Sequence, residues 1–333
     1  MVDTLYGHYK KDLSTSLLAQ STPSNTLINE KKLQTNPINT KAPVDRFPLL
    51  TKNSQPFVSI LNKLGLSDHH IAASGDFQKI SLDDVELVTA WSMNHHDEAV
   101  RLCDSIQQFY ELRKKKQQRL ISYNLGDVQP AVLVDFLRSC PIADLRQLNF
   151  TEYPHYVSKL LEYRWKSLII ADVLRESKAV LWIDSSTLFQ NDSITLQQIL
   201  DRETKEHQGV WLFDLTSHSI AAATNPLMFK YFNMTAQQAI DLDMWGANTM
   251  LWIGKRDVKE EVLKPFVQCS LVEDCMAPPG SILSCNFPPG PRRNYANCHR
   301  YDQAAVNVIV ALRAGLNITR YTISNSVLKT SRM

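Results

Sequence analysis

Asp184 is the residue with the clearest potential for chemistry, because it directly follows the continuous apolar run Ala179–Ile183. An unpaired buried carboxylate is costly, so a carboxylate at the end of an apolar strand is expected to meet a cation, a backbone donor or a ligand. Two hydroxyl residues, Ser185 and Ser186, come next. We therefore expect Asp184 to belong to a ligand site; the alternative is that it caps the following turn.

Polar residues also follow two earlier apolar runs. Asn94 and His95 come after residues 85–91, and Asn124 comes after residues 119–123. Ligands of open α/β sheets bind outside the carboxyl ends of the strands, so Asn94, His95, Asn124 and Ser186 are expected to border a nucleotide. Adjacent side chains do not share a helix face, so the run His95–Glu98 does not predict a four-ligand metal cluster. For the histidines, capping the following helix is the alternative.

Basic side chains offer partners for phosphate. Lys166 lies between an aromatic and an apolar stretch of an expected helix, where it could reach a phosphate or extend to solvent along apolar surface. Arg292 and Arg293 lie in a Pro-rich segment. They could neutralise a leaving diphosphate, or they could form an exposed basic loop.

The elements that must position these residues alternate along the chain. Strands are expected at residues 85–91, 119–123, 145–150 and 179–183, with helices at 96–116, 130–138 and 156–176. Such alternation predicts an α/β fold with a mostly parallel sheet and helices on both faces. The second half is less regular, with strands expected at 210–213, 219–223, 248–253 and 318–323 and helices at 257–267 and 303–313.

Composition divides the chain into three parts. Residues 1–55 are rich in Ser, Thr, Asn, Lys, Gln and Pro and lack a helical or strand period, which predicts a disordered stem or linker. Residues 56–80 are expected to form a short helical lead-in. Residues 81–333 form the predicted α/β domain, for which the apolar content of 44% supplies a core.

Charge and hydropathy exclude several classes of partner. The net charge of +2 is too small to indicate nucleic acid or a membrane surface. The basic run Arg113–Lys116 is expected at a helix C-terminus, where it complements the helix dipole. No stretch approaches the roughly 18 apolar residues of a membrane span, and the polar start Met1–Lys11 does not resemble a signal peptide.

Cysteines and sequons point to an oxidising compartment. The six cysteines include four in one short segment, Cys269, Cys275, Cys285 and Cys298, with spacings unlike those of a zinc site. Disulfides of undetermined pairing are therefore expected. Four glycosylation sequons start at Asn149, Asn191, Asn233 and Asn317. Together these features favour the secretory pathway, in the Golgi lumen or outside the cell, with any membrane anchor absent from this chain.

Several motifs resemble one family. The chain resembles, over about residues 85–320, an uncharacterised glycosyltransferase-like family that is expanded in nematodes. The resemblance is carried by WSMNHHDE, YNLG, FTEYPHYV, YRWKSLIIADVL, VLWIDSS, ANTMLWIG and NYANCHRYDQAAVNVI. It implies the A fold of nucleotide-diphospho-sugar transferases. Where the family pattern has Tyr-Asp-Leu-Gly and Trp-Lys-Pro, this chain has Asn124 and Ser167, and Asn124 removes a carboxylate from the nucleotide side.

The resemblance also implies roles for individual residues. Glycosyltransferases of the A fold place an Asp-x-Asp motif at the position of Asp184, where it holds Mn²⁺ or Mg²⁺ on the donor diphosphate. Here the second carboxylate is replaced by Ser186. Asn248 is similar to the residue that contacts the donor sugar. Asp302 and Gln303 resemble a helix start near the acceptor, where Asp302 would act as a base in an inverting reaction; plain helix capping is the alternative.

Three functions remain open at this point. The first is transfer of a sugar from a nucleotide sugar to a glycan or glycoprotein acceptor, with Asp184 and Asp302 as catalytic residues. The second is a catalytically inactive binding protein with the same fold, which the incomplete metal motif and Asn124 favour. The third, an enzyme using a dinucleotide, lacks support because no G-x-G-x-x-G follows the first strand.

Overall fold

The computed structural model describes residues 46–75, 77, 79–112, 119–189, 196–206, 208–323 and 328–330. The basic run Arg113–Lys116, the sequon at Asn191 and the greater part of the expected stem lie outside these residues. Among the helices that the structure describes, none combines the length and apolar character that a membrane span requires.

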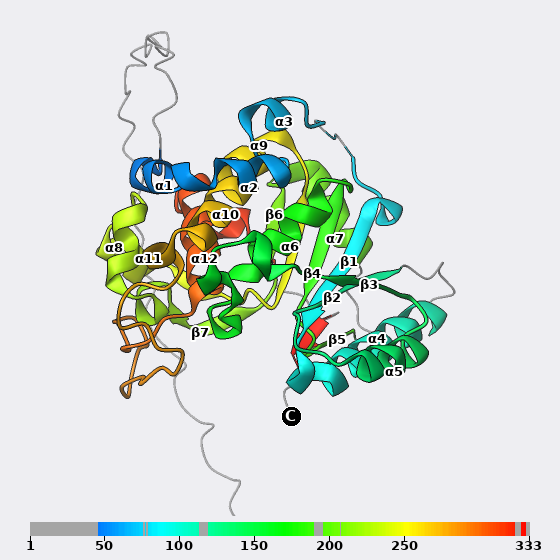
Figure 1. Ribbon diagram of the computed structural model, residues 1–333. Coiled ribbons are helices and arrows are strands. Elements are labelled where there is room, and N and C mark those ends of the chain that lie inside the picture. The colour runs from blue at the N-terminus through cyan, green and yellow to red at the C-terminus, as the bar shows by residue number, and fades with distance from the viewer. Residues whose placement is uncertain are drawn as a thin grey trace, which may run out of the picture. The chain divides into compact units, whose positions relative to one another are not determined.

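A six-stranded sheet forms the centre of the described chain (Figure 1). Its order is β3-β2-β1-β4-β9-β6; the first four strands run parallel, and β9 is antiparallel to both of its neighbours. This confirms the predicted α/β class with a mixed, mostly parallel sheet. The strands are β1 Val85–Trp91, β2 Leu120–Asn124, β3 Ala143–Gln147, β4 Ala179–Ile183, β6 Val210–Leu212 and β9 Thr249–Ile253.

The strand order changes direction next to β1. From β1 the chain moves outward to β2 and β3 on one side, and then returns to place β4 on the other side. Leu87 of β1 is therefore paired with Leu120 of β2 and with Leu181 of β4. A crevice opens at the carboxyl ends of the strands where the order reverses, and ligands of α/β sheets bind there. In this sheet that position lies between β1 and β4.

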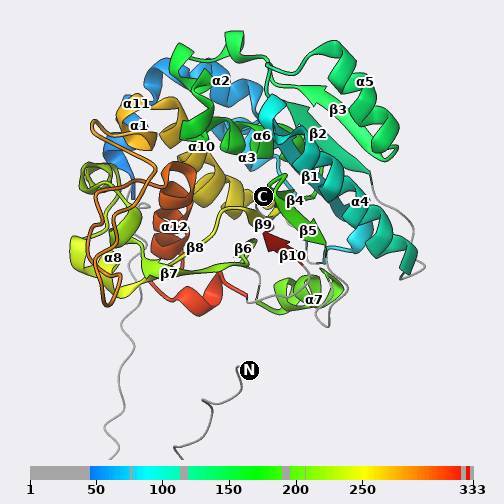
Figure 2. The same cartoon turned by 90° about the horizontal axis from the view of Figure 1, so that it is seen from below.

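Helices cover both faces of the sheet, because successive strand residues point to opposite sides. Val88 and Ala90 belong to a core shared with α6, α10 and α12, whereas Leu87 and Trp91 belong to a second core shared with α4, α5 and α7. Figure 2 shows the two groups of helices on either side of the strands. The helices are α1 Pro48–Asn53, α2 Val58–Lys63, α3 Asp68–Ala72, α4 His96–Leu112, α5 Pro130–Ser139, α6 Arg164–Leu174, α7 Leu196–Glu206, α8 Ala236–Asp241, α9 Arg256–Val258, α10 Lys264–Leu271, α11 Glu273–Met276 and α12 Tyr301–Arg313.

Three disulfides connect these elements. Cys103 of α4 is joined to Cys140 at the end of α5, and Cys269 of α10 is joined to Cys275 of α11. The third, Cys285–Cys298, closes the Pro-rich segment before α12. The structure confirms the expectation of disulfides and supplies the pairing that the sequence left open.

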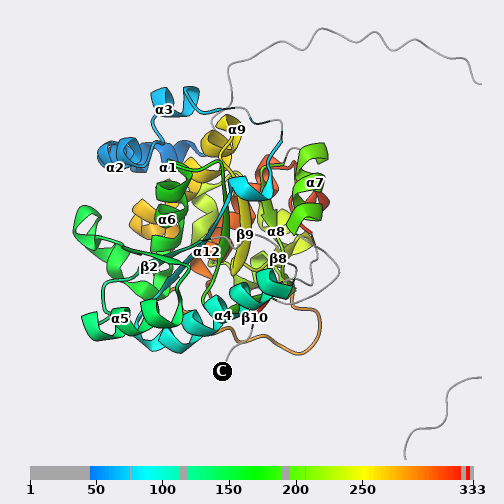
Figure 3. The ribbon, with the colours of Figure 1, turned by 90° about the vertical axis from the view of Figure 1, so that its right-hand side faces the viewer.

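The N-terminal boundary of the folded part lies earlier than the sequence suggested. Residues 48–53 form α1, and Leu50 is fully buried against the core. Ser54 is buried too, and its hydroxyl accepts a hydrogen bond of 2.8 Å from Gln268 of α10. The assignment of residues 48–55 to a disordered stem is therefore wrong. The segment is ordered because Leu50 packs into the hydrophobic core of the domain. Figure 3 shows α1, α2 and α3 gathered at one edge of the domain.

The helix expected at residues 156–176 is divided. Two short 3₁₀ turns, His155–Ser158 and Leu160–Glu162, precede α6. Tyr163 separates them from α6 with a left-handed backbone of φ 52°, which an ordinary helix cannot contain. The guanidinium of Arg164 donates to the carbonyls of Ser270, Val272 and Glu273 and so fixes the start of α6.

Two strand predictions in the second half are also wrong. Residues 221–223 form a 3₁₀ turn, and the strand lies earlier, at β7 Leu215–Ser219, paired with β8 Asp243–Trp245. Residues 318–320 form another 3₁₀ turn, after which Thr322 makes a single parallel bridge to Leu212. Short apolar runs do not distinguish strands from turns by period alone. A further pair, β5 Thr187–Phe189 with β10 Leu328–Thr330, was not expected.

Candidate functional site

Two adjoining pockets open at the carboxyl ends of β1 and β4. The Lys166 pocket has a volume of about 410 Å³ and is lined by residues that include Lys166, Asp214, Asn248, Arg292 and Asp302. The Trp91 pocket, of about 500 Å³, is lined by residues that include Trp91, Asn94, His95, Trp165 and Ser186. Tyr163, Asp184, Leu283 and Arg300 line both pockets. The two cavities therefore share one wall, and it lies where the strand order reverses.

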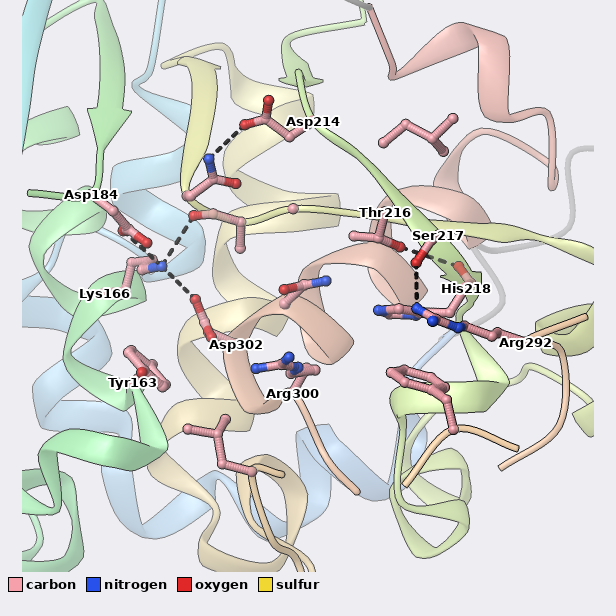
Figure 4. Close-up of a pocket in the computed structure, with 17 residues that line it drawn as sticks. Tyr163, Lys166, Asp184, Asp214, Thr216, Ser217, His218, Arg292, Arg300 and Asp302 are labelled. Carbon is pink, nitrogen blue, oxygen red and sulfur yellow. Dashed lines mark hydrogen bonds and ion pairs between the residues drawn. The ribbon is translucent and has the colours of Figure 1, made fainter. Parts of the chain in front are cut away.

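Lys166 of α6 supplies a buried positive charge (Figure 4). Its ammonium lies 2.7 Å from Asp302 Oδ2 and 3.1 Å from Asp184 Oδ1, and it donates to the carbonyl of Ala247 at 3.0 Å. Burial lowers the pKa of this amine, but the charges of Asp184 and Asp302 outweigh burial and raise it. Lys166 is therefore a cation at neutral pH. The alternative that its side chain extends to solvent is wrong.

Hydrogen bonds to the backbone and to one side-chain oxygen hold Asp184 at the end of β4. Its N–H donates to the carbonyl of Asn248 at 2.7 Å, and its own carbonyl accepts the N–H of Thr187. The indole of Trp182 donates to Oδ1 at 2.7 Å. The side chain remains 28% exposed, and this exposed part faces the wall common to the two pockets.

Asp302 and Gln303 begin α12 and line the Lys166 pocket. Burial raises the pKa of the Asp302 carboxyl, and the charge of Lys166 opposes that rise. Asn307 lies one turn later. Its side-chain oxygen accepts the N–H of Trp245 at 2.9 Å, and its side-chain amide donates to the carbonyl of Trp245 at 2.7 Å. Of the three residues that resemble the family motif, Asp302 and Gln303 line the pocket, whereas Asn307 holds the backbone of β8.

Asn248 and Asp214 form a second polar pair in the Lys166 pocket. The amide of Asn248 donates to Asp214 Oδ2 at 2.6 Å. Burial raises the pKa of Asp214, which the hydrogen bond from Asn248 opposes. Gly246 lies against this pair, since a β-carbon added there would approach Asn248 Oδ1 to 2.3 Å and Asp214 Cβ to 3.3 Å. A glycine at this position lets both side chains reach the pocket.

The opposite end of the Lys166 pocket is basic and aromatic. Arg292 donates to the hydroxyl of Ser217 at 2.9 Å and lies over the ring of Phe287 at 4.8 Å. The ring of His218 stacks on Phe287 at 5.1 Å, and burial lowers the pKa of His218. Phe287 and Arg292 both belong to the loop closed by Cys285–Cys298. This loop therefore contributes directly to the pocket wall.

The Trp91 pocket contains three of the predicted nucleotide contacts. Asn94, His95 and Ser186 all line it. His95 lies close to Glu98, with Nδ1 and Oε2 2.7 Å apart. Asn124 does not belong to the residues that line either pocket in the described chain; it is buried, and its Oδ1 accepts the N–H of Gly126 at 2.8 Å. The structure thus gives Asn124 a turn-capping contact rather than a place in the wall.

Arg293, a candidate from the sequence, and the nearby His299 both have structural contacts. Arg293 forms an ion pair with Asp243 at 2.6 Å, away from the lining of both pockets. His299 is fully buried, where its Nδ1 accepts the N–H of Asn225 at 3.1 Å and its Nε2 donates to the carbonyl of Met276 at 2.9 Å. Because Nδ1 accepts, this histidine is neutral. Both residues shape the segment that carries Arg292 and Arg300.

Sequence reasoning missed several lining residues. Asp214 follows the apolar strand β6, so the same strand-end rule that selected Asp184 would have found it. Tyr163, His218 and Arg300 carry no comparable signal, since each reaches the wall through a backbone break, a short antiparallel strand or a loop. Their positions depend on tertiary contacts.

The donor set does not fit a divalent cation held by the protein alone. Within the described residues, no group of three or more His, Cys, Asp or Glu side chains could ligate a metal together. Asp184 and Asp302 already share the ammonium of Lys166, and Ser186 replaces the second carboxylate of the motif. Hard divalent cations need several oxygen ligands, carboxylates above all. The metal role predicted for Asp184 therefore lacks carboxylate, histidine or cysteine partners among the residues that the structure describes.

Comparison with known proteins gives one family match. Residues 41–171 match the model of a protein family of unknown function, DUF1647. No curated protein is similar enough to this sequence to match it.

The solved structures that match this chain include three glycosyltransferases. The bifunctional glycosyltransferase WbbM is 16% identical with a TM-score of 0.34; the match covers 61% of this chain and 39% of WbbM. The galactosyltransferase LgtC is 12% identical over 74% of this chain and 86% of its own, with a TM-score of 0.38. Mouse xyloside xylosyltransferase 1 is 8% identical over 73% and 85% of the two chains, with a TM-score of 0.42.

Proposed function

We propose that this chain transfers a sugar from a nucleotide sugar to a hydroxyl of a glycan or glycoprotein acceptor. The observation that carries the proposal is the position of Asp184, at the end of β4 and in the common wall of two adjoining pockets. A transferase must bring two substrates together, and a shared wall at the reversal of strand order suits that requirement. The motif resemblance over residues 85–320 supports the same conclusion.

The two pockets suit different parts of the substrates. In the Trp91 pocket, Trp91, Leu125 and Trp165 offer apolar surface for a nucleobase, while Asn94 and His95 offer polar contacts for a ribose. The Lys166 pocket is lined by Asp, Asn, Gln, Arg and His side chains, which suit the hydroxyls of a sugar and an acceptor. Both volumes lie within the roughly 300–1,000 Å³ of ordinary ligand sites.

The proposed reaction is a displacement at the anomeric carbon. The acceptor oxygen forms a bond to that carbon, and the bond from the carbon to the diphosphate oxygen breaks with its electron pair on the leaving diphosphate. Arg300 in the shared wall and Arg292 in the Lys166 pocket would stabilise the negative charge that develops there. Asp184 would orient the donor by accepting hydrogen bonds from its hydroxyls.

Two carboxylates could receive the acceptor proton if the reaction inverts. Asp302 is the residue that the motif resemblance selects, but its carboxylate is engaged by Lys166. Asp214 also lines the pocket, and burial raises its pKa toward the range in which a general base works well. Replacing each by Asn distinguishes them, because the true base controls the acidic limb of the pH–rate profile.

A location in the secretory pathway is the second part of the proposal. Three disulfides are its support, since they form and persist in oxidising compartments. The Golgi lumen and the extracellular space both fit. The protein can be purified from cells and treated with a glycosidase that removes N-linked glycans. A loss of mass from glycans at Asn149, Asn233 or Asn317 would support this location independently of activity.

A non-catalytic binding protein is the competing function. Ser186 in place of a second carboxylate is the observation that favours it. Such a protein would still bind a nucleotide sugar or a glycan, but it would release no nucleoside diphosphate. Binding alone therefore cannot separate the two functions, whereas turnover can.

The test is turnover by the full chain. The protein is incubated with a panel of nucleotide sugars and a pooled mixture of glycoprotein acceptors, and release of nucleoside diphosphate is measured. We expect release with one donor, reduced at least about 100-fold by Asp184→Asn, a loss typical of removing one stabilising contact at a reacting centre. Asp144→Asn, which alters a surface ion pair on β3, serves as the matched control. Binding without release would favour the non-catalytic protein.

A further inference from the structure

We propose that the donor diphosphate binds without a divalent cation, because the ammonium of Lys166 permanently occupies the position between Asp184 and Asp302. This inference rests on the proposed function and specifies which positive groups neutralise the donor diphosphate. It differs from the expectation of Mn²⁺ or Mg²⁺ that the Asp-x-Asp resemblance implies.

Lys166 is enclosed by oxygen atoms, through one hydrogen bond and two ion pairs. A lysine ammonium has three N–H groups, and three oxygens surround this one: Asp302 Oδ2, Asp184 Oδ1 and the carbonyl of Ala247, at 2.7, 3.1 and 3.0 Å. The side chain is only 3% exposed, and the rings of Trp182 and Tyr163 lie 5.5 and 5.6 Å from the nitrogen. The ammonium therefore lies between the two carboxylates, in the position that a cation bound to both would need.

A divalent cation would have to compete with this ammonium. To bind both Asp184 and Asp302 it would need to displace Lys166 from two charged partners. To bind Asp184 alone it would lie next to the positive charge of Lys166, 3.1 Å from the same carboxylate, and like charges this close repel. Asp184 Oδ1 is moreover used by the indole of Trp182 at 2.7 Å. Neither arrangement matches the several anionic oxygens that such cations prefer.

Positive charge for the phosphates is available from arginine instead. Arg300 lines both pockets, so it borders the wall where the diphosphate must cross from the nucleoside to the sugar. Arg292 lies in the Lys166 pocket with a hydroxyl and an aromatic ring as partners, and within the described chain it has no carboxylate partner. Guanidinium groups bind phosphate oxygens in pairs. Figure 4 shows both side chains facing the pocket that also holds Asp302.

The first test compares binding with and without metal. Binding of a panel of nucleoside diphosphates to the full chain is measured by calorimetry, once in EDTA and once in Mn²⁺ or Mg²⁺. We expect one nucleotide to bind with a dissociation constant that differs by less than about threefold between the conditions. Binding at least about tenfold weaker in EDTA would overturn the inference while leaving the proposed function intact. An absence of binding in both conditions would overturn the proposed function and the inference together.

The second test uses Mn²⁺ alone as the probe, detected by its electron paramagnetic resonance. The wild-type chain is expected to bind no Mn²⁺ at the site, whereas Lys166→Met, which leaves Asp184 and Asp302 without their cation, should bind one ion. Adding Asp184→Asn to that variant should remove it again. Folded Lys166→Met protein that binds no Mn²⁺, or wild-type protein that binds Mn²⁺ through Asp184, would contradict the inference. If Lys166→Met does not fold, the calorimetric comparison decides.

Discussion

At the level of single residues, Lys166 is a buried cation of the candidate site, paired with Asp184 and Asp302. It is one of two lysines in the described chain that are nearly fully buried and paired with carboxylates. The other, Lys255, lies 2.7 Å from Glu203, beyond the start of β4 and so at the opposite end of that strand from Asp184. Both are ion pairs between a buried lysine and a carboxylate, but only Lys166 lines one of the two pockets. Lys255 is therefore a suitable control for the effect of removing a buried cation.

Lys166→Met should lower the free energy of unfolding by about 3–5 kcal/mol, because it leaves the buried carboxylate of Asp302 without its partner. Lys255→Met should cost a similar amount for the same reason, since the buried carboxylate of Glu203 would lose its partner. Denaturant unfolding measures both. Only Lys166→Met should also change nucleoside diphosphate binding, and an equal change in the Lys255 variant would show that Lys166 acts through stability alone.

His299 should make stability fall in acid. Burial lowers its pKa from 6.5 to about 4 in the folded chain, where only the neutral ring can accept from Asn225 and donate to Met276. The folded pKa lies below the unfolded one, so this stabilisation is complete above pH 6.5 and is lost as the pH falls toward 4. A shift of this size corresponds to about 3 kcal/mol.

The measurement compares urea unfolding at pH 7 and pH 4.5 for the wild type and for His299→Asn, whose amide does not titrate. The wild type should lose more stability between these values than the variant. Parallel losses in the two proteins would show that His299 is not the group responsible. Other buried groups then become the candidates for any acid sensitivity.

The residues of the site differ in how well the sequence could predict them. Asp184 was predictable because a carboxylate after an apolar strand stands out in any alternating α/β pattern. Asp302 and Asn248 followed from motif resemblance. The pairing of Lys166 with both carboxylates was not predictable, because α6, β4 and α12 are separated along the chain by many residues and meet only in the fold. The sequence showed a lysine on a helix and nothing about which face it used.

At the level of elements, the loop between Cys285 and Cys298 is the part of the wall with the least regular structure. Replacing both of these cysteines by Ser should lower stability by about 3 kcal/mol, the usual effect of opening a loop of this length. It should also weaken ligand binding, since Phe287 and Arg292 would lose their fixed position. Thermal melting and calorimetry measure the two effects.

The disulfide Cys103–Cys140 provides the matched control. It joins α4 to the end of α5, on the face of the sheet that carries the second core. Replacing this pair by Ser should reduce the melting temperature without a comparable loss of affinity. If both double variants reduce affinity equally, the loop has no special role in the pocket.

Regular elements were predicted best where burial is complete. The limits of β1 and β4 were predicted as residues 85–91 and 179–183, as observed, because strands buried on both faces carry continuous apolar and β-branched runs. The break at Tyr163 was not predictable, since its left-handed backbone depends on Arg164 reaching the carbonyls of α10 and α11. The β7–β8 pair was missed because three to five residues carry too little pattern.

At the level of the whole molecule, the N-terminal boundary of the domain is testable. A chain that begins at residue 45 keeps α1, whereas a chain that begins at residue 56 loses the buried Leu50 and the contact of Ser54 with Gln268. The shorter chain should be less stable by roughly 2–5 kcal/mol, the range for losing one large buried apolar side chain. Equal unfolding free energies for the two chains would place these residues outside the folded unit.

The sheet order brings the candidate site together from distant parts of the chain. The Trp91 pocket combines residues that follow β1, β2 and β4, and the Lys166 pocket adds residues from β7, the loop after α11 and α12. The first set was predictable because parallel strands end at the same edge of a sheet. The second was not, because loops and short antiparallel strands set its geometry.

The central claim is that this crevice binds a nucleoside diphosphate, and the melting temperature of the full chain tests it most directly. A ligand that binds only the folded state raises the melting temperature. We predict that one nucleoside diphosphate raises it for the wild type and for Arg138→Gln, an exposed arginine at the end of α5, and raises it far less for Arg300→Gln. Folded protein whose melting temperature changes with none of these nucleotides, or an Arg300→Gln variant that responds like the wild type, would contradict the account.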